Sequence, residues 1–318
     1  MRFRLPAGGG PRADSAPQAA EIMVARKTSQ RSRPAAPPPR RSRSLSWLLS
    51  VVAVALVATI ALAIRHRRAA AAAADVPAPP VPVPAAVMHD LAAIPAATWD
   101  AAGLEGVTAP ILVTSDPPRQ PKAVVLYIGS GWCPYCAAAR WSLITALARF
   151  GTFSGLAFAE SSPVDVYPST PTFEFYGSAY ASPYVDLQSV ELEADVQLPD
   201  GRYAQLQRPT AEQEALIKKY DAPPYLPPSK ADGIPFILVG GRYMWSGSPF
   251  SPALLAGRSQ GAIAASLPTG AGDAARAVLA NANQITATIC AVDGNQPAEV
   301  CETPLMRRAV AALPGTTP

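Results

Sequence analysis

Four consecutive residues, Cys133-Pro134-Tyr135-Cys136, have the clearest capacity for chemistry in this sequence. Two cysteines separated by two residues can exchange disulfides. The thiolate of one attacks a foreign disulfide, and the other then resolves the mixed disulfide. We expect Cys133 to attack and Cys136 to resolve. Trp132, directly before the pair, is expected to cover the site and flatten the surface that meets a protein substrate.

The segments on either side of the dithiol predict a strand followed by a helix. Lys122–Ser130 is a continuous apolar run with β-branched residues, which is typical of a buried central strand. The segment after Cys136 carries helix formers, with apolar residues at helical spacing. Cys133 would then lie at a helix N-terminus, which lowers the pKa of a thiol from about 8.5 toward 7 or below. Pro134 suits the first helical turn, where its missing N–H is not needed.

A metal site and a purely structural disulfide are the alternatives for the CxxC pair. A four-ligand zinc site needs a second pair at suitable spacing, but Cys290 and Cys301 are eleven residues apart. The only histidines, His66 and His89, are not near them in sequence. We therefore expect no metal and no cofactor, and we favour a redox-active dithiol over a structural disulfide.

A run of twenty uncharged residues, Leu45–Ile64, predicts a transmembrane anchor, since at 1.5 Å per residue it matches a hydrocarbon core about 30 Å thick. More basic residues precede it than follow it, so the N-terminus is expected in the cytoplasm and the C-terminal domain outside the plasma membrane. A cleaved signal peptide is the alternative, because Ala69–Ala74 offers small residues. Against it, the apolar run is long and the basic run Arg65–Arg68 follows it.

The segments that flank the anchor have biased compositions. Residues 1–44 are predicted to be a disordered basic cytoplasmic tail, and residues 65–89 an Ala/Pro-rich linker with a polyproline spacer. The formal net charge is +4, but the basic residues cluster before residue 70. We attribute the charge to membrane topology and expect no nucleic-acid partner.

The second cysteine pair follows a predicted helix, Asp273–Ile289, and a turn-rich loop separates Cys290 from Cys301. An even number of cysteines in an exported domain favours pairing. A loop of this size would stabilise the fold by about 2–3 kcal/mol in the chain-entropy model. We favour a structural disulfide. The alternative is a relay in which this pair exchanges electrons with Cys133 and Cys136.

The strand, the WCPYC segment and the long helix together resemble the thioredoxin superfamily, and the tetrad CPYC is the one common in glutaredoxins. The resemblance implies a proline opposite the dithiol, before a β-hairpin. Pro235 fits, because Phe236–Val239, a Gly-Gly turn and Arg242–Ser246 follow it. The resemblance further implies a cis Ile234–Pro235 bond, with the backbone of Ile234 pairing with the client. The client site it implies comprises Trp132, Pro134, Tyr135, Ile234 and Pro235.

About a hundred residues separate the dithiol from Pro235, so we expect an insertion at about 160–230. The stretch Glu160–Glu193 is similar to an uncharacterised thioredoxin-like family, domain of unknown function 929, which also has a late cysteine pair. The predicted fold class is therefore α/β: a thioredoxin-like domain at 90–305 with a long insertion between the CxxC helix and the cis-Pro hairpin, one transmembrane helix before it, and a tail at 306–318.

Within the expected insertion, local patterns predict several elements. Thr172–Tyr176 and Tyr184–Leu192 are predicted strands, and Thr210–Tyr220 is a predicted helix begun by a capping box with Gln213. We expect the aromatic residues of this segment to pack the enlarged domain, with a substrate groove as the alternative. They are Tyr167, Phe173, Phe175, Tyr176, Tyr180 and Tyr184.

One position departs from the thioredoxin pattern. Thioredoxins carry a buried carboxylate six residues before the first cysteine, which takes a proton from the resolving thiol, and here that position is Tyr127. A phenol with a pKa near 10 is a poor base at neutral pH.

These patterns predict a membrane-tethered, extracytoplasmic thiol–disulfide oxidoreductase acting on the disulfides of exported proteins. Its partners would be exported protein thiols or disulfides and a redox partner that recycles the dithiol. The alternatives are a non-catalytic thioredoxin-fold binding domain with structural disulfides, and a redox subunit dedicated to one membrane partner. The direction of exchange depends on the reduction potential, which one tetrad sets only loosely.

Overall fold

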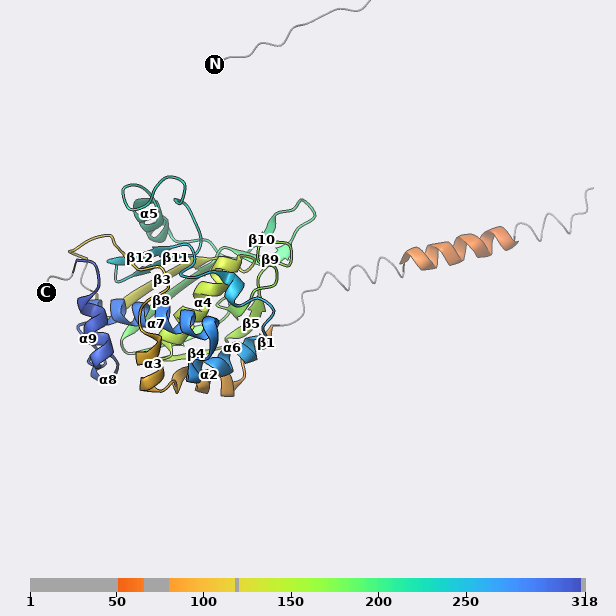
Figure 1. The fold of residues 1–318 in the computed structure, drawn as a ribbon. Helices are drawn as coiled ribbons and strands as arrows, with labels where there is room; N and C mark the ends of the chain where they lie inside the picture. The colour runs from red at the N-terminus through yellow and green to blue at the C-terminus, as the bar shows by residue number, and fades with distance from the viewer. Residues whose placement is uncertain (1–50, 66–79, 118–119, 316–318) are drawn as a thin grey trace, which may run out of the picture. The chain divides into compact units, whose positions relative to one another are not determined.

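The computed structural model describes residues 51–65, 80–117 and 120–315 (Figure 1). The chain divides into two compact units, with the boundary between Ala74 and Asp75. In the first unit, the described residues 51–65 form a helix. Within the described ranges, no helix is long and apolar enough to span a membrane. Residues 45–50 of the predicted anchor and the whole of the predicted tail 1–44 lie outside the described residues.

The second unit is built on a mixed five-stranded sheet with the order β2-β12-β11-β3-β8. In this sheet β3 pairs in parallel with β8 and antiparallel with β11, and β12 pairs antiparallel with both β11 and β2. The strand bounds are Ile111–Leu112 for β2, Ala123–Gly129 for β3, Val185–Glu191 for β8, Phe236–Val239 for β11 and Tyr243–Ser246 for β12. The α/β class predicted from the sequence is confirmed.

Helices cover both faces of this sheet (Figure 1). Successive side chains of a strand point to opposite faces. Val125 and Tyr127 of β3 accordingly join the core that contains α4 (Pro134–Leu147) and α7 (Gly272–Asp293). Leu126 and Ile128 join a second core with α5 (Ala211–Tyr220). The alternation along β3 therefore places Tyr127 on the same side of the sheet as the CxxC helix.

Three smaller sheets surround the central one. One has the order β1-β5-β6, and the pairs β4–β7 and β9–β10 form the others. Their bounds are Val81–Pro82 for β1, Thr152–Ser154 for β4, Ala157–Glu160 for β5, Pro171–Glu174 for β6, Ala179–Ala181 for β7, Glu193–Gln197 for β9 and Tyr203–Gln205 for β10. The segment 160–230 expected as an insertion thus contains β8, a strand of the central sheet, with β6 and β7 before it and β9, β10 and α5 after it.

The remaining helices lie before the dithiol and near the C-terminus. They are α2 (Ala85–Ala92), α3 (Ala96–Ala102), α6 (Gln260–Ser266), α8 (Ala298–Cys301) and α9 (Pro304–Ala311), with 3-10 turns at Pro252–Leu254 and Leu267–Thr269. The helix predicted at Thr210–Tyr220 is present as α5. Thr210 and Gln213 exchange the two hydrogen bonds of a capping box there, as predicted.

Two boundaries differ from those expected from composition. Residues 80–89, placed in the linker 65–89, belong to the folded unit: β1 pairs with β5 and Val87 of α2 is buried. Residues 306–311, placed in the tail 306–318, belong to α9, and Met306 in this helix and Leu313 just after it are buried. In both cases apolar side chains of a segment with biased composition pack against the main core, and burial of their apolar surface stabilises the fold.

Candidate active site

Cys133 forms the N-cap of α4 and Pro134 occupies the first helical turn, as the strand-to-helix pattern predicted. The Cys133 Sγ accepts a hydrogen bond from the backbone N–H of Cys136 at 3.2 Å. Both cysteines are free thiols, and the Cys133 residue is 3% exposed. Hydrogen bonding from the Cys136 side chain and backbone lowers the pKa of Cys133, with a further contribution from the Arg140 charge, although burial opposes it. Of the two thiols, Cys133 therefore has the lower pKa.

Cys136 lies deeper, with no exposed surface, and burial raises its pKa well above the ordinary value. Tyr127 of β3 lies close to it. A Cβ placed on Gly129 would stand 2.1 Å from the Tyr127 Oη and 3.1 Å from the Cys136 Sγ. Only glycine at position 129 leaves room for the phenol beside this thiol. Tyr127 is fully buried, and its hydroxyl has no hydrogen-bond partner among the residues that the structure describes.

A buried ion pair lies one helical turn after Cys136. Arg140 of α4 and Glu191 of β8 have side chains with 0% exposure. Arg140 Nε donates to Glu191 Oε1 at 2.8 Å and Nη2 donates to Oε2 at 2.7 Å, a bidentate arrangement. Nη2 also donates to the carbonyl of Ser130 at 2.8 Å, while Nη1 has no hydrogen-bond partner in the described part of the chain. This ion pair was not predicted from the sequence. The available sequence signal was an arginine within an otherwise uncharged part of the predicted helix.

Trp132 is half-buried and held in place by the β9–β10 hairpin. Its indole stacks on Tyr203 with the ring centroids 5.0 Å apart, and its Nε1 donates to Glu193 Oε2 at 2.7 Å. Its carbonyl accepts the backbone N–H of Ser162 at 2.9 Å. The small sheet after β8 thus fixes the residue before the dithiol.

The loop that carries Ile234 and Pro235, here called the proline loop, faces the dithiol, as the resemblance implied. The Ile234–Pro235 bond is cis, and the Cys133 Sγ lies 4.0 Å from the carbonyl oxygen of Ile234. Asp221, at the end of α5, fixes the loop, because its Oδ2 accepts the backbone N–H of Gly233 at 2.8 Å. Ile234 is half-buried, while Pro235 is buried under the loop.

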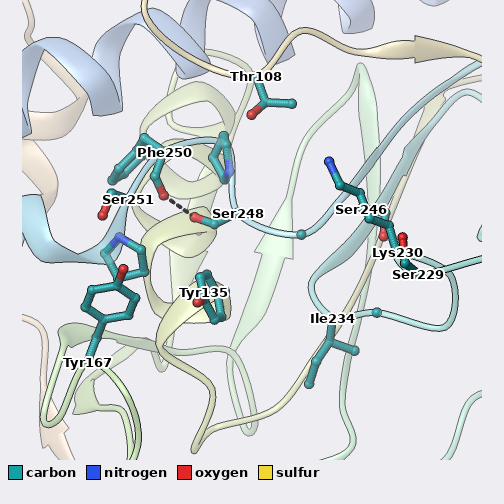
Figure 2. Close-up of a pocket in the computed structure, with 14 residues that line it drawn as sticks. Thr108, Tyr135, Tyr167, Ser229, Lys230, Ile234, Ser246, Ser248, Phe250 and Ser251 are labelled. Carbon is teal, nitrogen blue, oxygen red and sulfur yellow. Dashed lines mark hydrogen bonds between the residues drawn. The ribbon is translucent and has the colours of Figure 1, made fainter. Parts of the chain in front are cut away.

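An open groove of about 770 Å³ runs beside the proline loop and Tyr135 of the CxxC segment (Figure 2). Of the five residues expected to form a client site, Tyr135 and Ile234 line it, and Trp132, Pro134 and Pro235 do not. Tyr135 is 39% exposed. Several other residues that line the groove were not predicted from the sequence: Thr108, Ser229, Lys230, Ser248 and Phe250. The turn-rich run after β12 supplies two of them, and an alternation of Gly, Ser and Pro next to a hairpin was the available signal.

The aromatic residues expected to pack the domain divide between two roles. Phe173 and Phe175 are buried in the main core, as expected. Tyr167 instead lines the groove and meets Tyr135 edge-on, with the ring centroids 5.8 Å apart. Tyr176 is exposed. Packing is thus the correct prediction for the phenylalanines, while Tyr167 lines the groove; a substrate in that groove stays a prediction.

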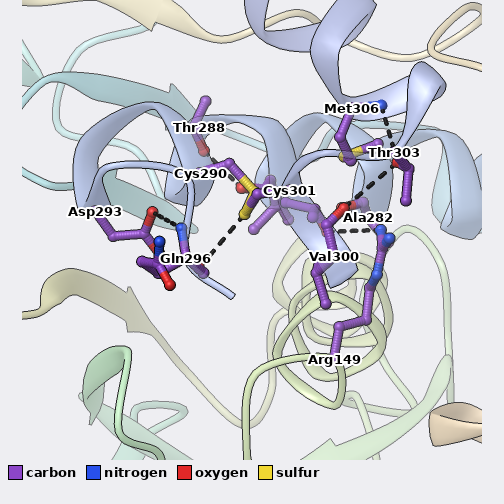
Figure 3. The surroundings of a disulfide bond; sticks show 12 residues. Arg149, Ala282, Thr288, Cys290, Asp293, Gln296, Val300, Cys301, Thr303 and Met306 are labelled. Carbon is purple, nitrogen blue, oxygen red and sulfur yellow. Dashed lines mark hydrogen bonds between the residues drawn. A yellow bond between two sulfur atoms is a disulfide. The ribbon is translucent and has the colours of Figure 1, made fainter. Parts of the chain in front are cut away.

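Cys290 and Cys301 form a disulfide, as predicted (Figure 3). Cys290 lies in α7 and Cys301 in α8, so a short helix replaces part of the loop expected between them. Gly294, with φ of 80°, ends α7, and Asp293 Oδ1 accepts the backbone N–H of Gln296 in the following turn. Both cysteines are buried in the main core, which favours the structural role over the relay.

Among the described residues no group of three or more His, Cys, Asp or Glu side chains is arranged to hold a metal ion. The fold and the site define an α/β protein with a free CxxC dithiol at the N-terminus of a buried helix. The chain belongs to the family described as Domain of unknown function (DUF929), whose model matches residues 114–291. No curated protein and no solved structure matches the chain.

Proposed function

We propose that this chain is a membrane-tethered thiol–disulfide oxidoreductase that acts on disulfides of exported proteins through Cys133 and Cys136. One observation carries the proposal: the Cys133 Sγ caps α4, accepts the N–H of Cys136 and faces the carbonyl of Ile234 across the cis peptide bond. This geometry gives a thiol of lowered pKa beside a backbone that can pair with an extended client.

The order of the central strands supports a thioredoxin-like fold. The strand before the dithiol, β3, lies between its parallel partner β8 and the antiparallel strand β11 that follows the cis-proline. The resemblance implied a proline opposite the dithiol and before a β-hairpin, and the hairpin β11–β12 that follows Pro235 pairs through β11 with β3.

The proposed exchange balances without a cofactor. The Cys133 thiolate attacks one sulfur of a client disulfide, a new S–S bond forms, and the electron pair of the broken bond leaves on the other client sulfur. The Cys136 thiolate then attacks the Cys133 sulfur and releases the second client thiolate. The client gains two electrons, and Cys133 and Cys136 become a disulfide. In the opposite direction, the same steps oxidise a client dithiol. A dithiol or disulfide protein of the same compartment recycles the pair.

The test compares the full-length protein with Cys133→Ser and Cys136→Ser. The wild type is expected to reduce insulin with a thiol donor or to oxidise a reduced peptide, and Cys133→Ser to do neither. Cys136→Ser is expected to accumulate mixed disulfides with clients. A potential near −120 mV would indicate an oxidase and one near −270 mV a reductase. A wild type that exchanges no disulfide under either condition would overturn the proposal.

The membrane tether is tested separately. If Leu45–Ile64 anchors the chain with its domain outside, a membrane-impermeant maleimide should label Cys133 in intact cells, with Cys133→Ser as the control for that residue. Labelling only after permeabilisation would contradict the extracytoplasmic location.

Burial of Cys133 is the observation that favours a second candidate, a non-catalytic binding domain, because the thiol is only 3% exposed. In that case Cys133→Ser would leave partner binding intact and no mixed disulfide would form.

A further inference from the structure

The surroundings of Cys136 contain donors in place of a base. Of the buried side-chain atoms without a partner in the described structure, Tyr127 Oη, Ser130 Oγ and Arg140 Nη1 belong to residues within six positions of the dithiol. An unsatisfied buried polar group costs about 1–3 kcal/mol, so its presence calls for a physical reason.

We propose that the Tyr127 hydroxyl is a positioning group that donates a hydrogen bond to the Cys136 thiolate when this thiolate resolves the mixed disulfide. This inference rests on the proposed exchange reaction and adds how the buried second thiol becomes reactive. A Cβ on Gly129 would contact both the hydroxyl that lacks a partner among the described residues and the Cys136 sulfur, so these two atoms are close neighbours.

The hydroxyl donates here and does not accept. Burial raises the pKa of Tyr127 well above its ordinary value, so the phenol keeps its proton. The carboxylate of Glu191 is not a free base, since both its oxygens accept from Arg140. The guanidinium carbon of Arg140 lies 5.9 Å from the centre of the Tyr127 ring, so a positive charge lies on the same side of the sheet.

The groups that face Cys136 change their balance during the reaction. In the free dithiol, burial and the Cys133 sulfur both raise the pKa of Cys136, while Arg140 lowers it and Glu191 raises it. In the mixed disulfide, Cys133 carries no charge, so its repulsion disappears. The hydrogen bond from the Tyr127 hydroxyl and the Arg140 charge then stabilise the Cys136 thiolate, which burial disfavours.

The step balances in atoms and electrons. The Cys136 thiol loses its proton to solvent or to the departing client sulfur, and its thiolate forms a bond to the Cys133 sulfur. The bond between Cys133 and the client breaks, and its electron pair leaves on the client sulfur. Tyr127 keeps its own proton throughout.

The reaction of the reduced full-length protein with 5,5′-dithiobis(2-nitrobenzoate) separates the two steps. Attack by Cys133 releases the first coloured thiolate in a phase that depends on reagent concentration. Resolution by Cys136 releases the second in a phase that does not. The leaving thiolate has a low pKa, so the second phase reports on the attacking thiol.

In Tyr127→Phe, the first phase should stay within about twofold of wild type. The second should slow roughly tenfold to a hundredfold, as expected for the loss of a hydrogen bond to a charged sulfur. The pH at which the second phase reaches half of its maximum should rise by about one unit or more. Phe keeps the ring that meets Phe175 edge-on at 5.2 Å, so the core should remain packed.

Tyr243→Phe is the matched control, because Tyr243 is a fully buried tyrosine on β12 of the same sheet. Both phases should be unchanged in it. A second phase of wild-type rate and pH profile in Tyr127→Phe would overturn the inference while leaving the proposed function intact. Absence of both phases in the wild type would instead overturn the proposed function. If Tyr127→Phe does not fold, Tyr127→Met, which also lacks the hydroxyl, carries the same test.

Discussion

Replacing Arg140 by Met should destabilise the protein by about 3–5 kcal/mol, because it leaves a carboxylate without its counterion inside the core. Arg140 and Glu191 have no exposed side-chain surface, and the guanidinium holds both carboxylate oxygens at 2.7–2.8 Å. Met fills much of the volume of the arginine stem, so the cost is mainly electrostatic. The free energy of unfolding is measured by urea titration of the full-length protein, followed by tryptophan fluorescence.

The loss in Arg140→Met should depend on pH, and its sign follows from Glu191. Burial raises the pKa of Glu191, and the Arg140 charge opposes that rise. Without Arg140 the folded-state pKa exceeds the unfolded value of about 4.3, so the folded protein holds the proton more tightly. The stability from this group is present below the unfolded pKa and is lost as the pH rises through the folded pKa. The deficit of Arg140→Met should therefore shrink as the pH falls from about 8 toward about 5.

The double variant Arg140→Met/Glu191→Met is the control for this reasoning. Because it removes both charges, it should recover most of the stability and lose the added pH dependence. A single variant that costs less than about 1 kcal/mol, or a double variant as unstable as the single one, would refute a coupled buried pair.

Three further predictions concern the cysteines and the glycine beside them. Replacing Cys290 and Cys301 by Ser should lower the free energy of unfolding by about 2–3 kcal/mol and leave exchange turnover unchanged. A variant that folds but has no turnover would favour the alternative, a relay in which this pair exchanges electrons with Cys133 and Cys136. Gly129→Ala should destabilise the fold by roughly 1–3 kcal/mol, because its Cβ would meet the Tyr127 hydroxyl, and adding Tyr127→Phe should recover part of that loss in thermal melts. The Cys136 side chain is the main cause of the lowered Cys133 pKa. The pH profile of iodoacetamide alkylation of Cys133 should therefore move to higher pH in Cys136→Ala and move less in Cys136→Ser. Profiles in both variants equal to that of the wild type would contradict that cause.

Local signals in the sequence were enough for the elements that carry the dithiol. The apolar run before Cys133 and the helix formers after it predict β3 and α4, and the Gly-Gly turn predicts the hairpin β11–β12. The capping box predicts the start of α5. In each case residues close in sequence determine the conformation, so a short window contains the information.

Contacts between distant residues were outside the reach of such windows. Arg140 and Glu191 are 51 residues apart, and nothing near either one identifies its partner. The partner of β3 in parallel pairing, β8, lies inside a segment expected as an insertion, because a strand pattern does not state which strand it joins. The ordered residues of the expected linker and tail fold because α2 and α9 find apolar surface, which composition alone does not reveal.

The groups around the dithiol also bear on the direction of exchange. Hydrogen bonds from Cys136 and the charge of Arg140 stabilise the Cys133 thiolate, and a thiolate exists only in the reduced protein. Stabilising the reduced form raises the reduction potential, by about 30 mV for each tenfold change in the equilibrium. We therefore expect these groups to make the Cys133–Cys136 couple more oxidising than the same couple without them, so that Arg140→Met should lower its reduction potential. Equilibration of the wild type and Arg140→Met with glutathione buffers measures the difference, and an equal or higher potential in the variant would contradict the role of the Arg140 charge.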